Sequence, residues 1–179
     1  MTRVSALDAL SHALESIWNL NANPVSDALA VEAAGTLIAT LPSLLADPRD
    51  LALRTEVSRA SLLAGLAFSN TKTALAHAIS YPLTLRYGVP HGIACSFTLP
   101  LVWSMAQGVS PARDVVLAEI FGPQETNPTG ALRSFLESVG VDCGFGAYGV
   151  SPAEAAAMLA LLEIRGLLLR RPDGRHETG

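Results

Sequence analysis

Two histidines lie fourteen residues apart in a segment that also contains prolines and glycines able to bend or end a helix. His77 falls in a stretch that reads as a helix, and His91 lies in a Pro-His-Gly turn. Pro82 lacks a backbone N–H and should kink or end the first helix, while Gly88 can supply the positive φ of a helix end. A helix, a kink, a return and a new helix would bring both imidazoles to one point. Either histidine alone is more typical of an ordinary core or surface position.

A second pair of polar residues lies near the N-terminus, in the segment ALDALSHALESIW. Asp8 and His12 are four residues apart, which in a helix puts a carboxylate and an imidazole one turn apart on one face. Two ligands of one metal ion need this arrangement, although the pair alone is also typical of a helix surface. Combined with His77 and His91, the metal interpretation is favoured, because buried imidazoles and carboxylates are costly without partners.

Helical elements must position these residues. Five prolines each follow a good N-cap residue, which predicts helix starts near residues 24, 48, 111, 128 and 152. Further helices are expected at about 6–19, 71–87 (interrupted) and 92–106. Apolar residues recur at intervals of three and four, and no strict alternation predicts a strand. We therefore expect an all-α bundle of about seven to eight helices.

The overall composition and net charge of the chain argue against several classes of function. The net charge of −4 argues against nucleic acid as a partner, and no long apolar run free of charge, proline or turn residues predicts a membrane span. We expect no membrane contact and a cytoplasmic location, since no leader pattern begins the chain. Cys95 and Cys143 are too few for a disulfide framework. Residues 1–164 are expected to form one domain, and 165–179 a polar tail that frays.

The segments DALSHALES and AHAISYPLTLRYGVPHGIACSFTLP together resemble the metal-binding C-terminal domain of iron-containing (group III) alcohol dehydrogenases. The resemblance implies a dehydroquinate synthase-like helical domain in which Asp8, His12, His77 and His91 bind iron(II), or zinc as in some members. One carboxylate and three neutral imidazoles suit either metal. Within the family, the sequence of these segments is most similar to the phosphonoacetaldehyde reductases.

The same resemblance implies an activity. The chain is expected to be the catalytic, metal-binding half of an NAD(P)-dependent alcohol dehydrogenase or aldehyde reductase, in which the metal polarises the substrate oxygen for hydride transfer. Small aldehydes or alcohols, with phosphonoacetaldehyde as a candidate, would be substrates, and a homodimer is expected. Family members carry NAD or NADP on an N-terminal domain with a glycine-rich turn, and no such turn occurs here. We expect the isolated chain to be inactive without that domain.

Other residues are candidate catalytic or substrate-binding residues because they match positions of the family. Tyr81 stands where many members have a second histidine near the nicotinamide, so it is a candidate for hydrogen bonding or proton relay. Phe68 matches a position that often faces the active site. Lys72, the only lysine, could pair with a phosphonate head. Cys95 could face the metal, but a small buried cysteine is the favoured interpretation.

Two alternatives to a catalytic half remain open. The chain could be a non-catalytic helical fragment stabilised by its metal. It could also be a helical interaction module whose apolar face docks on a partner, and this alternative predicts no stoichiometric metal.

Overall fold

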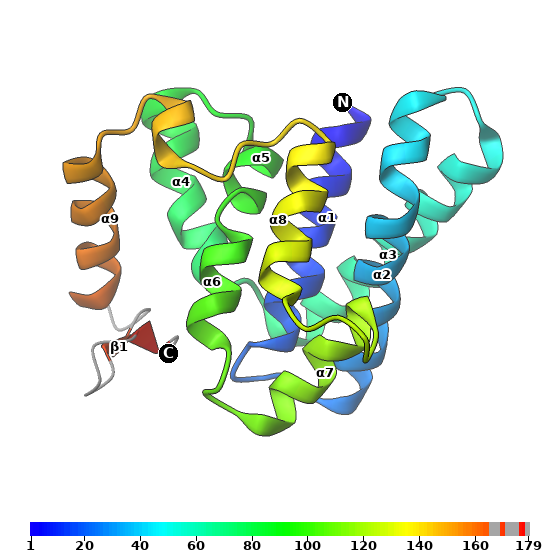
Figure 1. The fold of residues 1–179 in the computed structure, drawn as a ribbon, viewed down its shortest axis with the longest axis horizontal. Coiled ribbons are helices and arrows are strands. Elements are labelled where there is room, and N and C mark those ends of the chain that lie inside the picture. Colours follow the sequence, from blue (N-terminus) through cyan, green and yellow to red (C-terminus); the bar gives the residue numbers. More distant parts are fainter. Residues whose placement is uncertain (165–168, 171–175, 178–179) are drawn as a thin grey trace.

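The fold of residues 1–164, 169–170 and 176–177 is described by a computed structural model. A single helix, α1, runs through the middle of a helical bundle, with α2 and α3 on one side and α4, α5 and α6 on the other (Figure 1). The helices, in chain order, are α1 (Thr2–Ile17), α2 (Pro24–Ala46), α3 (Leu51–Thr71), α4 (Leu75–Tyr87), α5 (His91–Ser96), α6 (Leu99–Ala106), α7 (Pro111–Phe121), α8 (Pro128–Ser138) and α9 (Pro152–Ile164), with a 3-10 turn η1 (Phe145–Tyr148) before α9. The predicted all-α class is confirmed.

Local capping by a side chain explains the starts of α2 and α3. Asn23 accepts hydrogen bonds from the N–H groups of Val25 and Ser26, so α2 begins at Pro24 as predicted. The start predicted near residue 48 lies three residues later, at Leu51. The reason is that Asp50, rather than Asp47, caps the helix. Its carboxylate accepts hydrogen bonds from the backbone N–H groups of Ala52 and Leu53.

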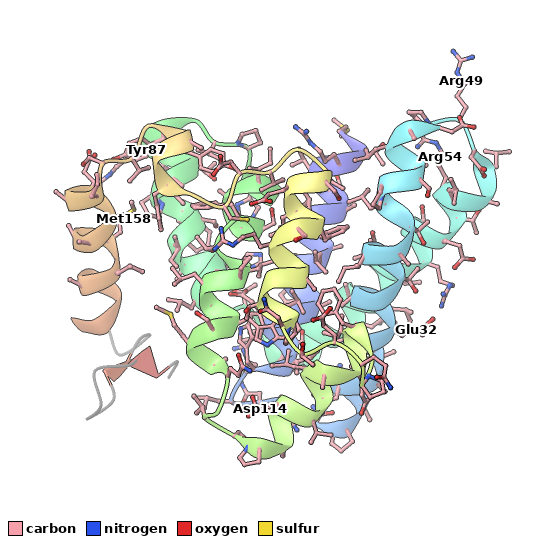
Figure 2. The ribbon with its side chains drawn as sticks, in the orientation of Figure 1. Glu32, Arg49, Arg54, Tyr87, Asp114 and Met158 are labelled. Atoms are coloured by element: carbon pink, nitrogen blue, oxygen red, sulfur yellow. The ribbon has the colours of Figure 1, made fainter. Side chains whose placement is uncertain are left out.

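The apolar face of α1 forms the centre of the core. Leu7, Leu10, Leu14 and Ile17 are all fully or almost fully buried, and they pack together with buried leucines of α2. Charged side chains such as those of Glu32, Arg49, Arg54 and Asp114 lie at the periphery (Figure 2). A polar or charged residue that is buried on α1 therefore stands out against a largely apolar interior.

The segment that carries the two histidines agrees with the expectation in part. Helix α4 begins at Leu75 rather than near residue 71, continues through Pro82 and ends at Tyr87, and Gly88 takes the predicted left-handed conformation with φ 66°. The helix expected over 92–106 is split into α5 and α6. Pro100 explains the split, because it has no N–H to donate to the carbonyl of Ser96 and its ring would clash with that carbonyl.

Helix α2 is long and apolar enough to cross a membrane by length and composition alone. A core helix passes the same test, and α2 buries Ala30, Ala33 and Leu37 within the bundle. The absence of membrane contact stays a prediction.

The tail contains two short strands, β1 (Leu169–Arg170) and β2 (His176–Glu177), which pair antiparallel with Leu169 opposite Glu177. The predicted fraying otherwise falls on 165–168, 171–175 and 178–179, which lie outside the described residues.

Candidate metal centre

Three helices bring the predicted ligands to one place. Asp8 and His12 lie one turn apart on α1, His77 lies in the first turn of α4, and His91 is the first residue of α5. The ring centroids of His77 and His91 are 5.5 Å apart. The predicted convergence of the two histidine rings is therefore confirmed, and the chain returns at Gly88.

The spacing of the polar atoms suits a shared cation. The Oδ1 atom of Asp8 lies 3.5 Å from Nε2 of His77 and 3.7 Å from Nε2 of His91. Ligand atoms around one tetrahedral ion with bonds of about 2.1 Å are separated by roughly 3.4 Å. With Sγ of Cys95, these atoms all lie within 4.8 Å of one another.

Two of these atoms lack the partners that buried polar groups require. Asp8 Oδ1 and His77 Nε2 are both buried and have no hydrogen-bond partner among the described residues. Leaving buried polar atoms unpaired is costly, and a cation held between them would satisfy both. The residues present therefore fit a divalent metal ion.

His12 lies beside the cluster rather than within its tightest group of atoms. Its ring is stacked on His77, with centroids 4.6 Å apart and planes at 12°, and on Phe68 at 4.4 Å and 15°. Burial lowers the pKa of His12, although the charge of Asp8 opposes this effect. A lowered pKa keeps the imidazole neutral, as a metal ligand must be.

The protonation of the other two groups follows from their neighbours. Burial would raise the pKa of Asp8, but pairing with His77 and the nearby His12 and His91 rings outweigh burial, and the pKa lies below its usual value. Burial would lower the pKa of His77, but Asp8, Cys95 and Glu15 raise it to about 12. Without a metal ion, the anionic Asp8 thus faces a protonated His77, and a metal ion that binds at Nε2 would displace that proton.

Glu15 is a functional residue that the sequence analysis missed. It is fully buried on α1, and its carboxylate accepts a hydrogen bond from Nδ1 of His77 at 2.6 Å. The available signal is its spacing, because Glu15 follows His12 by three residues and Asp8 by seven, on the same helix face. This spacing marks a third ionisable residue on the face of α1 that carries Asp8 and His12.

Two of the remaining candidates lie against the cluster. Tyr81 is on the same face of α4 as His77, one turn later, and its ring centroid is 6.2 Å from that of His91. It is 55% exposed, so its hydroxyl can be reached from solvent. Phe68, at the C-terminal end of α3, covers the outer face of the His12 ring.

Lys72 is placed differently. It is the exposed residue that ends α3, and it alone among the described non-glycine residues has a positive φ, of 76°. Its carbonyl accepts a hydrogen bond from Asn19, near the C-terminal end of α1. Its backbone is therefore anchored away from Asp8, and none of the ion pairs found within residues 1–164 involves it.

Cys95 and Gly92 lie on α5 next to His91. The thiol of Cys95 is buried, and its Sγ lies 3.6 Å from Nε2 of His91. Gly92 sits where α5 crosses α1, and a Cβ added there would overlap the carbonyl oxygen of Val4. This glycine allows the two backbones to approach closely, which brings His91 within reach of Asp8.

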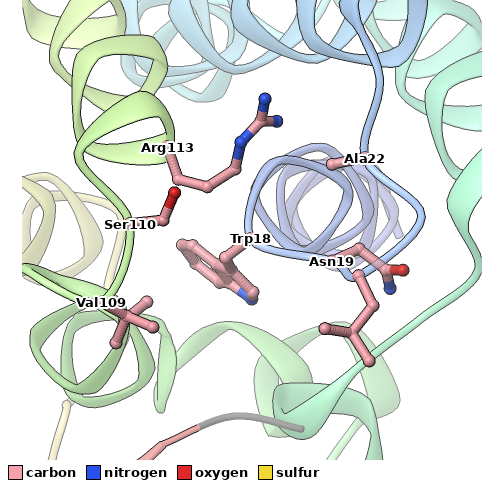
Figure 3. Close-up of a pocket in the computed structure, with 8 residues that line it drawn as sticks. Trp18, Asn19, Ala22, Val109, Ser110 and Arg113 are labelled. Carbon is pink, nitrogen blue, oxygen red and sulfur yellow. The ribbon is translucent and has the colours of Figure 1, made fainter.

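A separate pocket lies at the other end of α1. Trp18, Asn19, Ala22, Val109, Ser110 and Arg113 line it (Figure 3). Ten residues of helix separate Trp18 from Asp8, which corresponds to about 15 Å. Arg113 is held by Asp27 at 2.7 and 2.8 Å. None of the predicted site residues lines this pocket.

Comparison with known proteins places the site in a family context. Residues 2–168 match the model of the "Fe-containing alcohol dehydrogenase family, C-terminal". The 1,3-propanediol dehydrogenase of Klebsiella pneumoniae is 35% identical over 126 residues, which cover 70% of this chain and 33% of that protein. The sulfoacetaldehyde reductase of Bilophila wadsworthia is 28% identical over 168 residues, covering 88% of this chain and 43% of that protein.

Solved structures agree with the sequence comparison. The sulfoacetaldehyde reductase of Bifidobacterium kashiwanohense, solved in complex with NAD+, superposes with a TM-score of 0.82 at 28% identity. The match covers 90% of this chain and 43% of that one. The chain thus spans between a third and a half of the length of these relatives.

Proposed function

Since this chain belongs to the Fe-containing alcohol dehydrogenase family, we propose that it supplies the metal-binding, catalytic half of an NAD(P)-dependent alcohol dehydrogenase or aldehyde reductase. The observation that carries the proposal is the buried, unpartnered pair of Asp8 Oδ1 and His77 Nε2, joined by His91. Asp8, His12, His77 and His91 would hold iron(II), with zinc as the alternative. Iron or zinc suits this mixed set of one carboxylate and three imidazoles.

The chemistry divides between the metal, the nicotinamide and the chain. When bound, the metal supplies Lewis acidity towards the alcohol or aldehyde oxygen, while NAD(P) carries the hydride. Asp8 contributes the one negatively charged ligand of the proposed set, and the ring of Phe68 shields His12 on its outer face. The exposed hydroxyl of Tyr81 can donate a hydrogen bond, although a phenol is a poor base near neutral pH.

The substrate class follows from the proposed site and from what the relatives act on. Two of the similar proteins are sulfoacetaldehyde reductases, and sulfoacetaldehyde is a small aldehyde with an anionic head. We propose a substrate of this kind, with phosphonoacetaldehyde as the first to test. Lys72, at the C-terminal end of α3, is the proposed partner for the anionic head.

The activity is tested by following oxidation of NADH and NADPH at 340 nm with phosphonoacetaldehyde, sulfoacetaldehyde and propanal. We expect little turnover from the chain alone and turnover once a nucleotide-binding domain from a relative is supplied. A complex that holds metal and cofactor but reduces none of the aldehydes would favour the non-catalytic, metal-stabilised alternative. The replacement Lys72→Met should raise KM for the two anionic aldehydes and leave propanal unchanged; an equal effect on all three would remove Lys72 from the proposal.

The remaining parts of the proposal concern association and location. Leu62, Leu66 and Leu85 are exposed apolar side chains, and a homodimer is proposed, to be tested by light scattering of the purified chain. The cytoplasmic location and the absence of membrane and nucleic-acid partners also remain proposals.

A further inference from the structure

We propose that Glu15 is a positioning residue that fixes the tautomer and orientation of His77, and that it ties the metal centre to the start of α4. This inference rests on the proposed metal site. It assigns a role to a buried carboxylate that is not itself one of the proposed ligands.

The carboxylate of Glu15 is surrounded by donors from a single segment. One oxygen, Oε2, accepts hydrogen bonds from Nδ1 of His77 at 2.6 Å and from the N–H of Ala74 at 2.9 Å. The other, Oε1, accepts from the N–H groups of Ala76 and His77. An ionised carboxylate offers about four acceptor positions, so this arrangement uses its full capacity.

The backbone part of this arrangement caps a helix from outside. Helix α4 begins after Ala74, which has no side chain able to cap it. The first N–H groups of a helix need acceptors, and a negative charge is favoured at that end. Glu15, from the middle of the bundle, provides both, which holds the first turn of α4 and the backbone of His77 against α1.

The hydrogen bond between the His77 side chain and Glu15 determines which ring nitrogen of His77 faces the other ligands. Because an ionised carboxylate can only accept, the Nδ1 atom next to it must carry a proton. In the neutral ring the lone pair is then on Nε2, the atom 3.5 Å from Asp8 Oδ1. Histidine ligands commonly donate their second N–H to a carboxylate in this way. The direction of His77 as a ligand is therefore set by Glu15.

An amide in place of the carboxylate separates this role from simple space filling. In Glu15→Gln the shape is almost unchanged, but the NH2 group cannot accept. When the NH2 group points towards His77, it faces the proton on Nδ1. The ring then favours the tautomer with its proton on Nε2, and that proton blocks metal binding. With the amide reversed, the NH2 meets the N–H groups of Ala76 and His77. Both orientations oppose the geometry needed for binding.

The experiment measures zinc affinity by calorimetry for the wild type, for Glu15→Gln and for Glu119→Gln, the same chemical change at an exposed position of α7. Circular dichroism of the metal-free proteins checks that each is folded. We expect Glu15→Gln to bind zinc roughly 10- to 100-fold more weakly, and Glu119→Gln to match the wild type. Equal affinity in a folded Glu15→Gln variant would overturn the proposal.

A second measurement needs no variant and decides the matter if Glu15→Gln fails to fold. Nitrogen-15 NMR of the zinc-loaded wild type should show His77 coordinated through Nε2, with a hydrogen-bonded proton on Nδ1. Coordination through Nδ1, or a proton on Nε2, would contradict the proposed role. If the wild type binds no zinc or iron at all, the proposed function fails as well. If it binds the metal but His77 coordinates through Nδ1, only the role of Glu15 is contradicted.

Discussion

The Nε2 atom of His77 on α4 lies 3.5 Å from the Oδ1 atom of Asp8 on α1, and neither atom has a hydrogen-bond partner among the described residues. The rest of the candidate site is arranged around this pair. His91 approaches the same Asp8 oxygen from α5, and Glu15 holds the far side of the His77 ring. A cation bound between Asp8 Oδ1 and His77 Nε2 would satisfy both atoms, which are two of the four buried side-chain N and O atoms without a hydrogen-bond partner in the described part of the chain.

Replacing either convergent histidine should remove the metal. His77→Ala and His91→Ala each delete a ligand, and we expect bound iron or zinc to fall well below the wild-type amount, measured by elemental analysis after desalting. His176→Ala makes the same change at the one histidine that has no proposed function, and it should retain the wild-type metal content. Wild-type stoichiometry in both ligand variants would mean that the ligands were assigned wrongly.

Removing the metal should lower thermal stability. A ligand that binds only the folded state contributes about 2.7 kcal/mol at a hundred times its Kd. For a domain of this size, this corresponds to a shift in Tm of roughly 5–11 °C. Thermal melts followed by circular dichroism, with chelator and with zinc in excess, provide the comparison. Identical melting curves under the two conditions would argue against a metal that joins α1, α4 and α5.

Gly92→Ala should disturb the site without touching a ligand. Its Cβ would overlap the carbonyl oxygen of Val4, so α5 must move away from α1 and carry His91 away from Asp8. We expect a destabilisation of about 1–3 kcal/mol together with weaker zinc binding, measured by urea unfolding and calorimetry.

The matched control for Gly92→Ala is Gly65→Ala on α3. A Cβ at Gly65 meets no atom within 4 Å, and alanine is favoured over glycine inside a helix by about 1 kcal/mol. The control should therefore be neutral or stabilising and bind zinc normally. If both variants behave alike, close approach at Gly92 does not position His91.

Cobalt substitution distinguishes His12 from Cys95 as the fourth ligand. Sγ of Cys95 belongs to the tightest group of ligand atoms, whereas the family resemblance assigns His12. We predict that the cobalt-loaded chain lacks a thiolate-to-metal charge-transfer band, that Cys95→Ser retains the metal and that His12→Ala loses it. A charge-transfer band that disappears in Cys95→Ser would place the thiolate in the ligand set instead.

Local sequence signals predicted those parts of the structure that depend on local interactions. The helix starts at Pro24, Pro111, Pro128 and Pro152 were predictable because proline is favoured at the first helical position, which is a local effect. The left-handed Gly88 was predictable for the same reason. The meeting of His77 and His91 also followed from the turn between them.

Tertiary contacts decided the features that the sequence analysis missed. Glu15 is a capping residue for α4, but it lies on α1, so no local pattern at Ala74 reveals it. Similarly, the close approach of Gly92 to Val4 depends on how α5 crosses α1. The break between α5 and α6 could have been predicted from Pro100, whose effect on the carbonyl of Ser96 is local.

The most direct test of the central claim is the metal content of the chain purified without added metal. Elemental analysis should find close to a single iron or zinc ion per chain, and a metal-stripped sample should regain the same amount on reconstitution. A chain that carries no metal and takes up neither iron(II) nor zinc would contradict the account and favour a helical interaction module.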